Sequence, residues 1–440
     1  MGESIPTGVS MGRRGAPLRI PKDRYLSAEA HRLEVERLWP RVWQIACRSD
    51  DLPEPGDHLE YVIGDQSVLV LRDEAGEVRA FHNVCLHRGN LLAPGVGHTR
   101  KLVCGFHCWT WNLDGSLHRV SYPDRFGEID PEAYRLRAVR VAEWGGFVFV
   151  CLSADPPELR EWLGPVPEQL APYHLERYTR TQDWSLYIRA NWKTGLDAFL
   201  ESYHVQGVHP QLLAFLDDAT TVYECFGAHS RMLIPVGTPS PLLGRVANRQ
   251  IFESMVRSAS GSDTELDHVQ DKAALVQSLA AMDLPPGTTV RDWLVASTRA
   301  QGEARGIDLS GLSDDQVAGD WHYHLFPNAV FNVYAGAFWL CRFRPHGDDP
   351  NWMRFDFQDY HWIADPEEAR QRKAVHCFVE PGEVSLGEVM DQDIAQLPKI
   401  QRGLHSRGIS ELTLSTMEVR IAHMHRILDG FLGSGATSAR

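Results

Sequence analysis

Short apolar runs with a two-residue alternation dominate the chain from about residue 43 to residue 152. They are rich in β-branched and aromatic residues, and turn signals such as Gly64-Asp65 and Asp114-Gly115 separate them, as expected for short strands. The predicted strands cover residues 58–63, 67–72, 78–84 and 147–152. The pattern therefore predicts a small all-β module over residues 43–157, with Pro156-Pro157 at its exit.

The segment before this module has a different composition. Residues 1–24 carry Gly, Pro and basic residues and are expected to form an arm, and a short helix is predicted over residues 28–38. We assign residues 1–42 to an N-terminal arm and helix that pack on the domain formed by residues 158–440.

Longer elements follow in residues 158–440. Ala335-Gly336 predicts the turn of a β-hairpin over residues 329–344, and Ser415-x-x-Glu418 resembles a capping box before a final helix. Further strands are predicted over residues 184–188 and 352–362, a helix from Trp192, and helices and loops over 240–320, with 263–282 the most helical part. The chain therefore reads as a β module joined to an α+β domain.

Composition narrows the class of protein. The 440 residues are 43% hydrophobic and 23% charged, and the formal net charge is −14, which disfavours a nucleic-acid partner. No apolar run approaches the roughly 18 residues of a membrane span, and residues 1–6 lack the apolar core of a secretion signal. The eight cysteines are then expected to be reduced thiols of a soluble cytoplasmic protein.

Two cysteine–histidine pairs lie inside the predicted β module. They are Cys85-Leu-His87 and Cys104-Gly-Phe-His107. Zinc can take two cysteines and two histidines, but its sites usually pair Cys with Cys and His with His. One Cys and one His from each loop instead fit a Rieske [2Fe–2S] cluster, in which two thiolates hold one iron and two imidazoles the other.

A second group of metal-ligand residues lies in residues 191–210. Glu201 and His204 are three residues apart and are expected on one helix face. His209 is five residues further, about 140° away on an ideal helix, but Gly207 and Pro210 should end the helix and let its imidazole turn back. Two histidines and one carboxylate form a facial triad that leaves Fe(II) open to O₂.

The residues alone leave the third ligand open. Glu201 is nearest in sequence, but it would suit equally well a role in fixing an imidazole through its other nitrogen. Asp391 and Asp393 stand near the start of a predicted helix and could reach back to the histidines.

Together these patterns resemble the catalytic α subunit of the Rieske non-haem iron oxygenases, the aromatic-ring-hydroxylating dioxygenase group. The resemblance rests on both Cys/His pairs, Asn191-Trp192-Lys193, Tyr203-His204-x₄-His209-Pro210, Leu325-Phe-Pro-Asn328, and Asp393 eight residues before Gln401. It implies that His204, His209 and Asp393 hold the iron, with Asp391 as the alternative. It also implies that Glu201 bridges the two metal centres, and that Asn191 and Tyr203 surround the ligands.

The resemblance further implies an α+β fold, in which a small all-β Rieske module joins a larger domain with an antiparallel sheet flanked by helices (helix-grip, START/Bet v1-like). It implies a homotrimer (α3), or an α3β3 assembly with β subunits. The expected partners are O₂, a small organic substrate and an NAD(P)H-dependent reductase, with or without a ferredoxin. The reductase is expected to be a separate protein, because the chain has no Gly-x-Gly-x-x-Gly fingerprint for binding a dinucleotide.

Two positions depart from the family's usual pattern. Glu201 replaces the Asp typical of ring-hydroxylating members, and some members that oxidise quaternary amines carry Glu there. Cys108 stands where many members have Gly, and we expect it to be a packed thiol near the cluster.

The substrate is the least determined feature. Aromatic residues on the predicted hairpin are expected to line the pocket, and they favour dihydroxylation of an aromatic compound: Phe331, Tyr334, Phe338 and Trp339. Glu201 favours the alternative, monooxygenation of a quaternary amine or oxidative demethylation. A non-catalytic Rieske electron carrier and a zinc-stabilised binding module remain further alternatives, but the second histidine group disfavours both.

Overall fold

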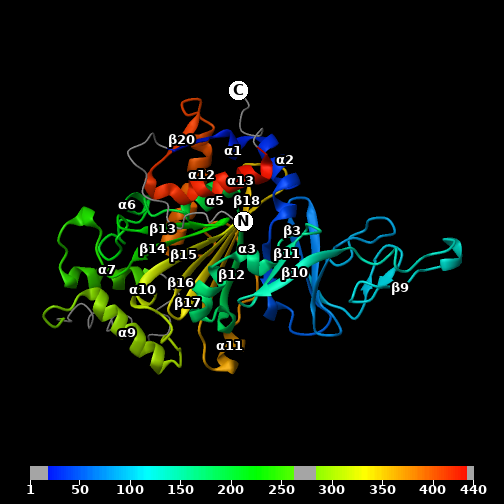
Figure 1. Cartoon of the computed structure of the whole chain (residues 1–440), viewed down its shortest axis with the longest axis horizontal. Helices are drawn as coiled ribbons and strands as arrows, with labels where there is room; N and C mark the ends of the chain where they lie inside the picture. The colour runs from blue at the N-terminus through cyan, green and yellow to red at the C-terminus, as the bar shows by residue number, and fades with distance from the viewer. Residues whose placement is uncertain (1–17, 262–283, 434–440) are drawn as a thin grey trace, which may run out of the picture. The chain divides into compact units, whose positions relative to one another are not determined.

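The computed structural model describes residues 18–261 and 284–433, and the chain divides into two compact units. One unit is Leu33–Leu163, and the other joins the segment ending at Arg32 to Gly164–Arg440 (Figure 1). The helix predicted over residues 263–282 lies outside the described residues. Among the described helices, none is long and apolar enough to cross a membrane.

The Leu33–Leu163 unit is built on an antiparallel sheet with the strand order β2-β11-β10-β5-β4-β3-β6. A smaller sheet, β7-β8-β9, carries one of the cysteine–histidine loops. The strands are β2 (Gln44–Arg48), β3 (Asp57–Ile63), β4 (Gln66–Arg72), β5 (Val78–His82), β6 (Val96–His98), β7 (Leu102–Val103), β8 (Thr110–Trp111), β9 (Leu117–Arg119), β10 (Ala138–Trp144) and β11 (Phe147–Cys151). All four strands predicted in this region are confirmed as β3, β4, β5 and β11.

One apolar core holds both loops in this unit. Leu69, Phe81, Trp109 and Trp111 pack in it, and Cys85 and Cys104 belong to the same cluster. The cysteines are therefore anchored by burial of apolar surface around them.

The second unit contains a larger sheet with the order β13-β14-β15-β16-β17-β18-β12-β19. Its pairings are antiparallel except for β12 with β19. Its strands are β12 (Thr179–Ile188), β13 (Val222–Phe226), β14 (His229–Pro235), β15 (Gly319–Leu325), β16 (Ala329–Tyr334), β17 (Ala337–Pro345), β18 (Met353–His361) and β19 (Cys377–Phe378). The predicted hairpin is confirmed as β16 and β17, with Gly336 at a positive φ of 100° in its turn.

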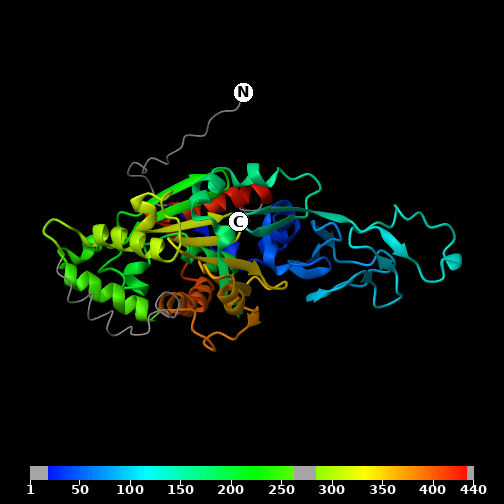
Figure 2. The ribbon, with the colours of Figure 1, turned by 90° about the horizontal axis from the view of Figure 1, so that it is seen from below.

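Helices and short segments complete this unit (Figures 1 and 2). They are β1 (Leu18–Pro21), which pairs with β20 (Glu411–Leu414), and the helices α1 (Asp23–Leu26), α4 (Val166–Leu170), α5 (Trp192–Ala198), α6 (Val205–Val208), α7 (Asn248–Gly261), α9 (Val290–Ala304), α10 (Asp314–Val317), α11 (Pro366–Arg372), α12 (Glu388–Leu404) and α13 (Val419–Leu432). Helix α2 (Ala28–Arg37) spans the boundary between the units, and α3 (Leu159–Leu163) ends the first unit. The final predicted helix is confirmed as α13, and Glu418 bonds the Ser415 N–H at 2.7 Å.

The register of β17 divides the large sheet into two faces, because successive side chains on a strand point to opposite sides. Phe343 contacts Phe199, the residue after α5, with ring centroids 5.2 Å apart. We call this side the α5 face, and alternation places Cys341 and Trp339 on it as well. Helix α5 lies close to the sheet at Gly195, where a Cβ would stand 2.6 Å from Met353.

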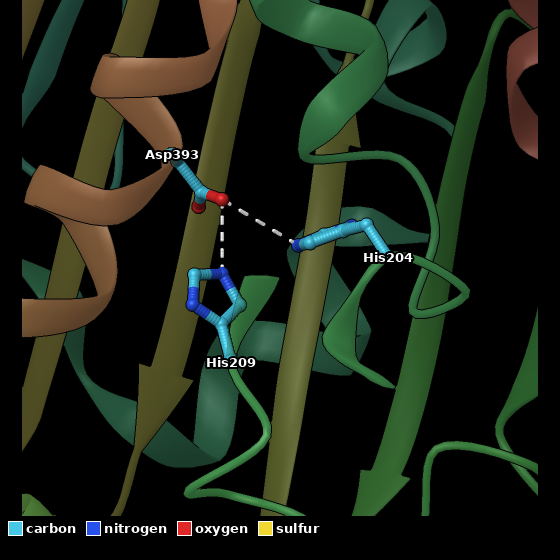
Figure 3. A group of neighbouring side chains, drawn as sticks. All are labelled: His204, His209 and Asp393. Atoms are coloured by element: carbon cyan, nitrogen blue, oxygen red, sulfur yellow. Dashed lines mark hydrogen bonds and ion pairs between the residues drawn. The ribbon is translucent and has the colours of Figure 1, made fainter. Parts of the chain in front are cut away.

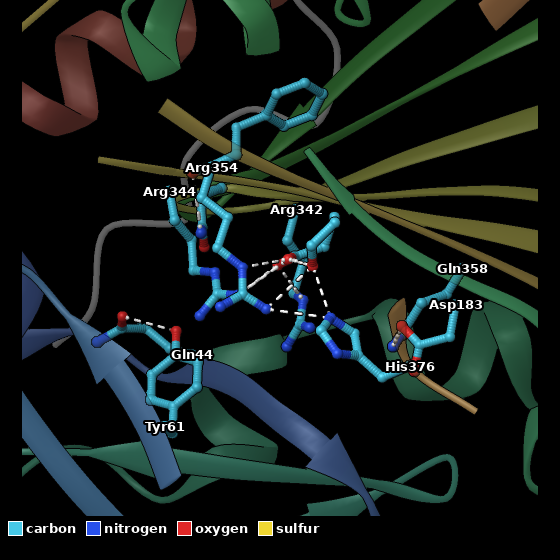
Figure 4. A network of polar contacts seen from close by, with 12 residues as sticks. Gln44, Tyr61, Asp183, Arg342, Arg344, Arg354, Gln358 and His376 are labelled. Atoms are coloured by element: carbon cyan, nitrogen blue, oxygen red, sulfur yellow. Dashed lines mark hydrogen bonds and ion pairs between the residues drawn. The ribbon is translucent and has the colours of Figure 1, made fainter. Parts of the chain in front are cut away.

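The other side, the Asp356 face, carries a buried charged network (Figure 4). Asp356 accepts from Arg354 Nε at 2.8 Å and Ser185 Oγ at 2.6 Å, and it pairs with Arg344 at 2.7 Å and Arg342 at 3.2 Å. Burial opposes the charge on Asp356, but the three guanidinium groups outweigh it and hold the pKa of this carboxyl far below its usual range.

One predicted element is wrong in detail. The helix that begins at Trp192 ends at Ala198, so Glu201 and His204 do not share a helix face. Glu201 Oε2 instead accepts the His204 backbone N–H at 3.0 Å, a bond from a side chain that competes with helix continuation. The chain then makes only the single turn of α6 before His209.

Candidate functional site

The three predicted iron ligands converge in space (Figure 3). Asp393 Oδ1 lies 2.9 Å from His209 Nε2 and 3.6 Å from His204 Nε2. One ligand atom from each residue lies within 4.8 Å of the others, and His209 and Asp393 are buried. Two imidazole nitrogens and a carboxylate oxygen form the donor set of a facial triad.

Short elements place the two histidines. His204 immediately precedes α6 and His209 immediately follows it, and the His209 N–H bonds the Val205 carbonyl at 2.9 Å. A single helical turn thus brings the two rings to a centroid distance of 5.1 Å. Asp393 is a buried residue of α12, which brings the carboxylate from 184 residues beyond His209.

Each histidine is oriented by an oxygen on its far nitrogen. His204 Nδ1 lies 2.6 Å from Glu201 Oε1, and His209 Nδ1 lies 2.7 Å from Gln392 Oε1. An oxygen acceptor favours the tautomer with hydrogen on Nδ1, which leaves the Nε2 lone pair toward Asp393. The residues present therefore fit a divalent metal held through both Nε2 atoms.

The carboxylates around His204 also affect its charge. Burial by itself lowers the pKa of His204, but the hydrogen bond and charge of Glu201, followed by the charge of Asp393, raise it. The site is thus electronegative, and it favours a bound cation over an empty pair of neutral rings.

The geometry separates the three candidate carboxylates. Asp391 accepts the Leu386 N–H at 3.0 Å and the Ser385 hydroxyl at 2.6 Å, so it caps the loop before α12. Glu201 lies on the Nδ1 side of His204, away from the Nε2 atom that faces Asp393. Asp393 remains as the proposed third ligand.

Of the two residues expected around the ligands, Asn191 has its contacts elsewhere. Asn191 caps α5, accepting the Lys193 N–H at 3.0 Å, and its amide donates to the Pro350 carbonyl at 2.8 Å. Its backbone N–H bonds Gln401 of α12 at 3.0 Å, so it ties α5 to α12 and does not orient an imidazole. Tyr203 is 48% exposed.

The ligand group lies on the α5 face of the large sheet. Val205 of α6 and Val389 of α12 pack in one apolar cluster with Met232 of β14, and Met232 lies opposite His322 in the β14–β15 pairing. Burial, with smaller contributions from Arg420, His324 and His204, lowers the pKa of His322 well below its usual value. Strand register puts His322 opposite Asn332 and Asn332 opposite Trp339, on the same face as Cys341.

Half of the predicted substrate pocket is wrong. Trp339 and Tyr334 lie on the α5 face, with their ring centroids 5.9 Å apart. Phe331 and Phe338 lie on the opposite face, where Phe338 stacks on Tyr360 at 4.3 Å. The two phenylalanines are therefore fully buried packing residues of the Asp356 face.

The two cysteine–histidine loops have related backbones. The Gly89 N–H bonds the Cys85 carbonyl at 2.9 Å, and the Cys108 N–H bonds the Cys104 carbonyl at 2.9 Å. The thiols of Cys85 and Cys104 are hydrogen-bond neighbours, and the rings of His87 and His107 lie 4.6 Å apart.

These four side chains fit a Rieske cluster. The Nδ1 atoms of His87 and His107 are buried and lack a hydrogen-bond partner within the described parts of the chain, which leaves both available to a metal. Burial, then the charges of His107 and Arg88, lower the pKa of His87. Burial opposes ionisation of Cys104, but the backbone N–H groups of His107 and Phe106 outweigh it and lower the pKa of this thiol.

The Cys108 side chain is not buried as the sequence predicted. It is exposed, so the prediction of a packed thiol is wrong. Its φ is +58°, a left-handed conformation that Gly adopts most easily, and Gly89 at the matching position of the other loop has a φ of +76°. The Gly preferred by many family members thus has a backbone explanation.

Sequence reasoning missed Gln392. The sequence offers one indication of this role: Gln392 is next to the predicted ligand Asp393, and a residue beside one ligand can reach another ligand of the same metal. No sequence motif marks a glutamine whose amide oxygen bonds an imidazole.

Comparisons with known proteins agree with this geometry. Residues 42–137 match the Rieske [2Fe-2S] domain, and residues 175–434 match the ring hydroxylating alpha subunit (catalytic domain). The chain is 34% identical over 208 residues to the glycine betaine monooxygenase oxygenase subunit of Chromohalobacter salexigens, covering 47% of this chain and 46% of that one. It is 33% identical over 208 residues to the chloroplastic choline monooxygenase of Beta vulgaris, covering 46% of each.

The chain thus spans about half the length of the curated relatives it matches. Its fold resembles the quaternary ammonium Rieske monooxygenase CntA, solved with L-carnitine, at a TM-score of 0.65 and 17% identity, covering 94% of this chain and 96% of that one. It resembles naphthalene 1,2-dioxygenase with bound indole at a TM-score of 0.66 and 18% identity, covering 94% and 92%.

The match to the ring hydroxylating alpha subunit (catalytic domain) covers more than half of the chain and includes all three converging ligand residues. The chain accordingly belongs to the ring-hydroxylating α subunits of Rieske-type oxygenases, with a Rieske [2Fe–2S] domain followed by a catalytic domain that binds mononuclear iron.

Proposed function

We propose that this chain is a terminal oxygenase that uses O₂ to oxidise a quaternary ammonium compound, by hydroxylation or oxidative demethylation. The observation that carries the proposal is the convergence of His204, His209 and Asp393 in a chain that also has a Rieske domain. An electron carrier or a zinc module would have no use for this second group.

Two observations support a quaternary ammonium substrate. The relatives at 33–34% identity are named for glycine betaine and choline, which both carry a trimethylammonium group. Glu201 occupies the acidic position where some members that oxidise quaternary amines also carry Glu. Because the relatives match over only half their length, the substrate class needs a direct test.

Aromatic dihydroxylation, the first expectation from the sequence, has less support. The likeness to naphthalene 1,2-dioxygenase at 18% identity concerns the fold alone. Two of the four aromatic residues that favoured this reading, Phe331 and Phe338, lie on the far side of the sheet.

Each residue has a proposed role in this function. His204, His209 and Asp393 hold the iron, and Glu201 and Gln392 fix the two imidazoles. Cys85, His87, Cys104 and His107 hold the cluster. When bound, the cluster supplies one-electron transfer and the iron supplies O₂ activation, while the protein contributes placement of the substrate and exclusion of water.

We further propose that electrons come from an NAD(P)H-dependent reductase, with or without a ferredoxin. The chain is proposed to assemble as a homotrimer, alone or with β subunits, and Glu201 to couple the iron of one subunit to the cluster of its neighbour.

The test is reconstitution of anaerobically purified protein with a surrogate reductase. Glycine betaine, choline and carnitine should stimulate O₂ uptake and release a stoichiometric aldehyde, whereas naphthalene should not. The protein should contain about three irons and two acid-labile sulfides per chain. Turnover of naphthalene to a diol without turnover of any quaternary amine would reverse the choice of substrate.

A further inference from the structure

A buried carboxylate on the α5 face has an oxygen without a partner in the part of the chain that the structure describes. Asp359 of β18 is 0% exposed, and its Oδ2 lies 2.9 Å from His361 Nε2. Its Oδ1 is buried and has no hydrogen-bond partner among residues 18–261 and 284–433. A buried carboxylate oxygen in this state is costly unless a positive group approaches it.

Aromatic rings surround the same position. Asp359 lies directly opposite Trp339 in the β17–β18 pairing, so both side chains point to the α5 face. The Trp339 ring meets Tyr334 at a centroid distance of 5.9 Å and Phe357 at 6.0 Å, both edge to face. Three rings and one carboxylate therefore share one region of this face.

This region is close to the proposed iron site. Trp339 lies opposite Asn332, and Asn332 lies opposite His322, so the region shares a face with Met232, which packs with Val205 and Val389 beside the ligands. Trp339 and Tyr334 keep part of their surface accessible although β16 and β17 are central strands. A small molecule bound there would have its far end near the ligand group.

We propose that Asp359, Trp339, Tyr334 and Phe357 form the subsite for the quaternary ammonium group of the substrate. This inference rests on the proposed function and adds the residues that select the substrate. A quaternary ammonium has no N–H to donate, so it is recognised by ring faces and by an opposite charge, which are the groups found here. A primary amine would instead need several acceptor oxygens.

The subsite predicts discrimination of charge at constant shape. Glycine betaine and 3,3-dimethylbutanoate have nearly the same outline, but only the first carries the positive nitrogen. Rings and a carboxylate should favour the compound with the positive nitrogen by about tenfold or more. A purely apolar pocket would favour the compound with the uncharged tert-butyl group.

The experiment compares four single variants of the anaerobic holoenzyme. Trp339→Leu and Asp359→Asn remove the ring and the charge, Trp339→Phe keeps a ring, and Trp321→Leu is the matched control on the Asp356 face. Calorimetry measures binding of glycine betaine, 3,3-dimethylbutanoate and tetramethylammonium, and turnover gives KM and kcat. The visible spectrum of the cluster and the iron content verify that each variant is folded.

Trp339→Leu and Asp359→Asn should each weaken binding of glycine betaine and tetramethylammonium about tenfold or more, and lose the preference for glycine betaine over 3,3-dimethylbutanoate. Trp339→Phe should recover part of the affinity, and Trp321→Leu should match the wild type. If the folded variants bind tetramethylammonium as the wild type does, the subsite is wrong, whatever the enzyme oxidises. If the wild type binds quaternary amines here but oxidises none, the subsite stands and the proposed function fails.

Discussion

At the scale of single residues, the iron site depends on groups that do not touch the metal. Gln392 Oε1 lies 2.7 Å from His209 Nδ1, and the same oxygen accepts from Gln211 Nε2 at 2.8 Å. The Gln211 amide holds the acceptor in place, and the acceptor holds the imidazole. Removal of a residue that orients a ligand in this way typically lowers metal affinity by roughly 10- to 100-fold.

Replacement of this acceptor is a direct test. Gln392→Leu should lower the affinity of the mononuclear site for Fe(II) by roughly tenfold to a hundredfold, because His209 loses its orienting bond. Competition with a chelator measures this affinity. Gln396→Leu on the same helix is the control, since Gln396 bonds Lys399 and no ligand. Equal iron affinity in both variants would remove Gln392 from the site.

A second residue-scale prediction concerns backbone strain at Cys108. Its φ of +58° costs roughly 1 kcal/mol for a residue with a side chain, so Cys108→Gly should stabilise the protein by about that amount. Denaturant unfolding followed through the cluster's visible spectrum measures the change. Gly89→Ala, at a φ of +76°, should have the opposite effect. A loss of stability in Cys108→Gly would mean that the exposed thiol makes a favourable contact.

At the scale of elements, the central strands of the large sheet present different side chains on its two faces. The α5 face places polar and aromatic groups near the ligand set, while the Asp356 face joins β12, β17 and β18 through one carboxylate shared by three arginines. Removal of a carboxylate that is buried among positive groups strongly destabilises a protein, because the positive charges stay buried without a counter-charge.

Asp356→Asn should therefore destabilise the catalytic unit on the order of 3 kcal/mol at neutral pH. The sign with pH follows from the lowered pKa: the stabilisation is present above the carboxyl's unfolded pKa near 4, and it is lost as the pH falls below that value. Thermal unfolding between pH 3 and pH 7, roughly the range that spans this titration, should show a steeper loss for the wild type than for Asp356→Asn. Parallel curves would contradict the role of Asp356.

At the scale of the whole molecule, two metal domains must cooperate in one reaction. Glu201 is bonded to His204 through both its ring nitrogen and its backbone N–H, so it is rigidly placed beside a proposed iron ligand. A carboxylate in this position can couple the orientation and charge of a bound imidazole to a second partner. We propose that this partner is a cluster histidine of a neighbouring subunit.

With Fe(II) supplied in excess so that both metals are bound, Glu201→Ala should slow reoxidation of the reduced cluster by substrate and O₂ about tenfold or more. Single-turnover spectroscopy of the cluster measures this rate. Glu201→Gln is the matched variant, because its amide oxygen can still accept from His204 while the charge is absent. Normal reoxidation in the iron-loaded Glu201→Ala variant would remove the bridging role and leave the assignment of the three iron ligands unchanged.

Much of the fold followed from local pattern. Period-two runs and turn residues predicted β3, β4, β5, β11 and the β16–β17 hairpin, because strand formation and turn chemistry are set by nearby residues. The α5–α6 region did not follow, since α5 ends at Ala198 and the Glu201 side chain accepts the His204 N–H in place of a helical carbonyl. A long-range or side-chain-to-backbone contact of this kind leaves no periodic signal.

The sequence by itself determined the kinds of metal ligand, their pairing in two loops and one histidine group, and the order of the domains, because these depend on residue type and short spacing. Only the tertiary structure decided that Asp393 and not Asp391 meets the histidines, since α12 joins them from far along the chain. It also decided that Trp339 faces this group while Phe338 faces away. Alternation separates the two side chains, but only helix packing determines which face of the sheet becomes the site.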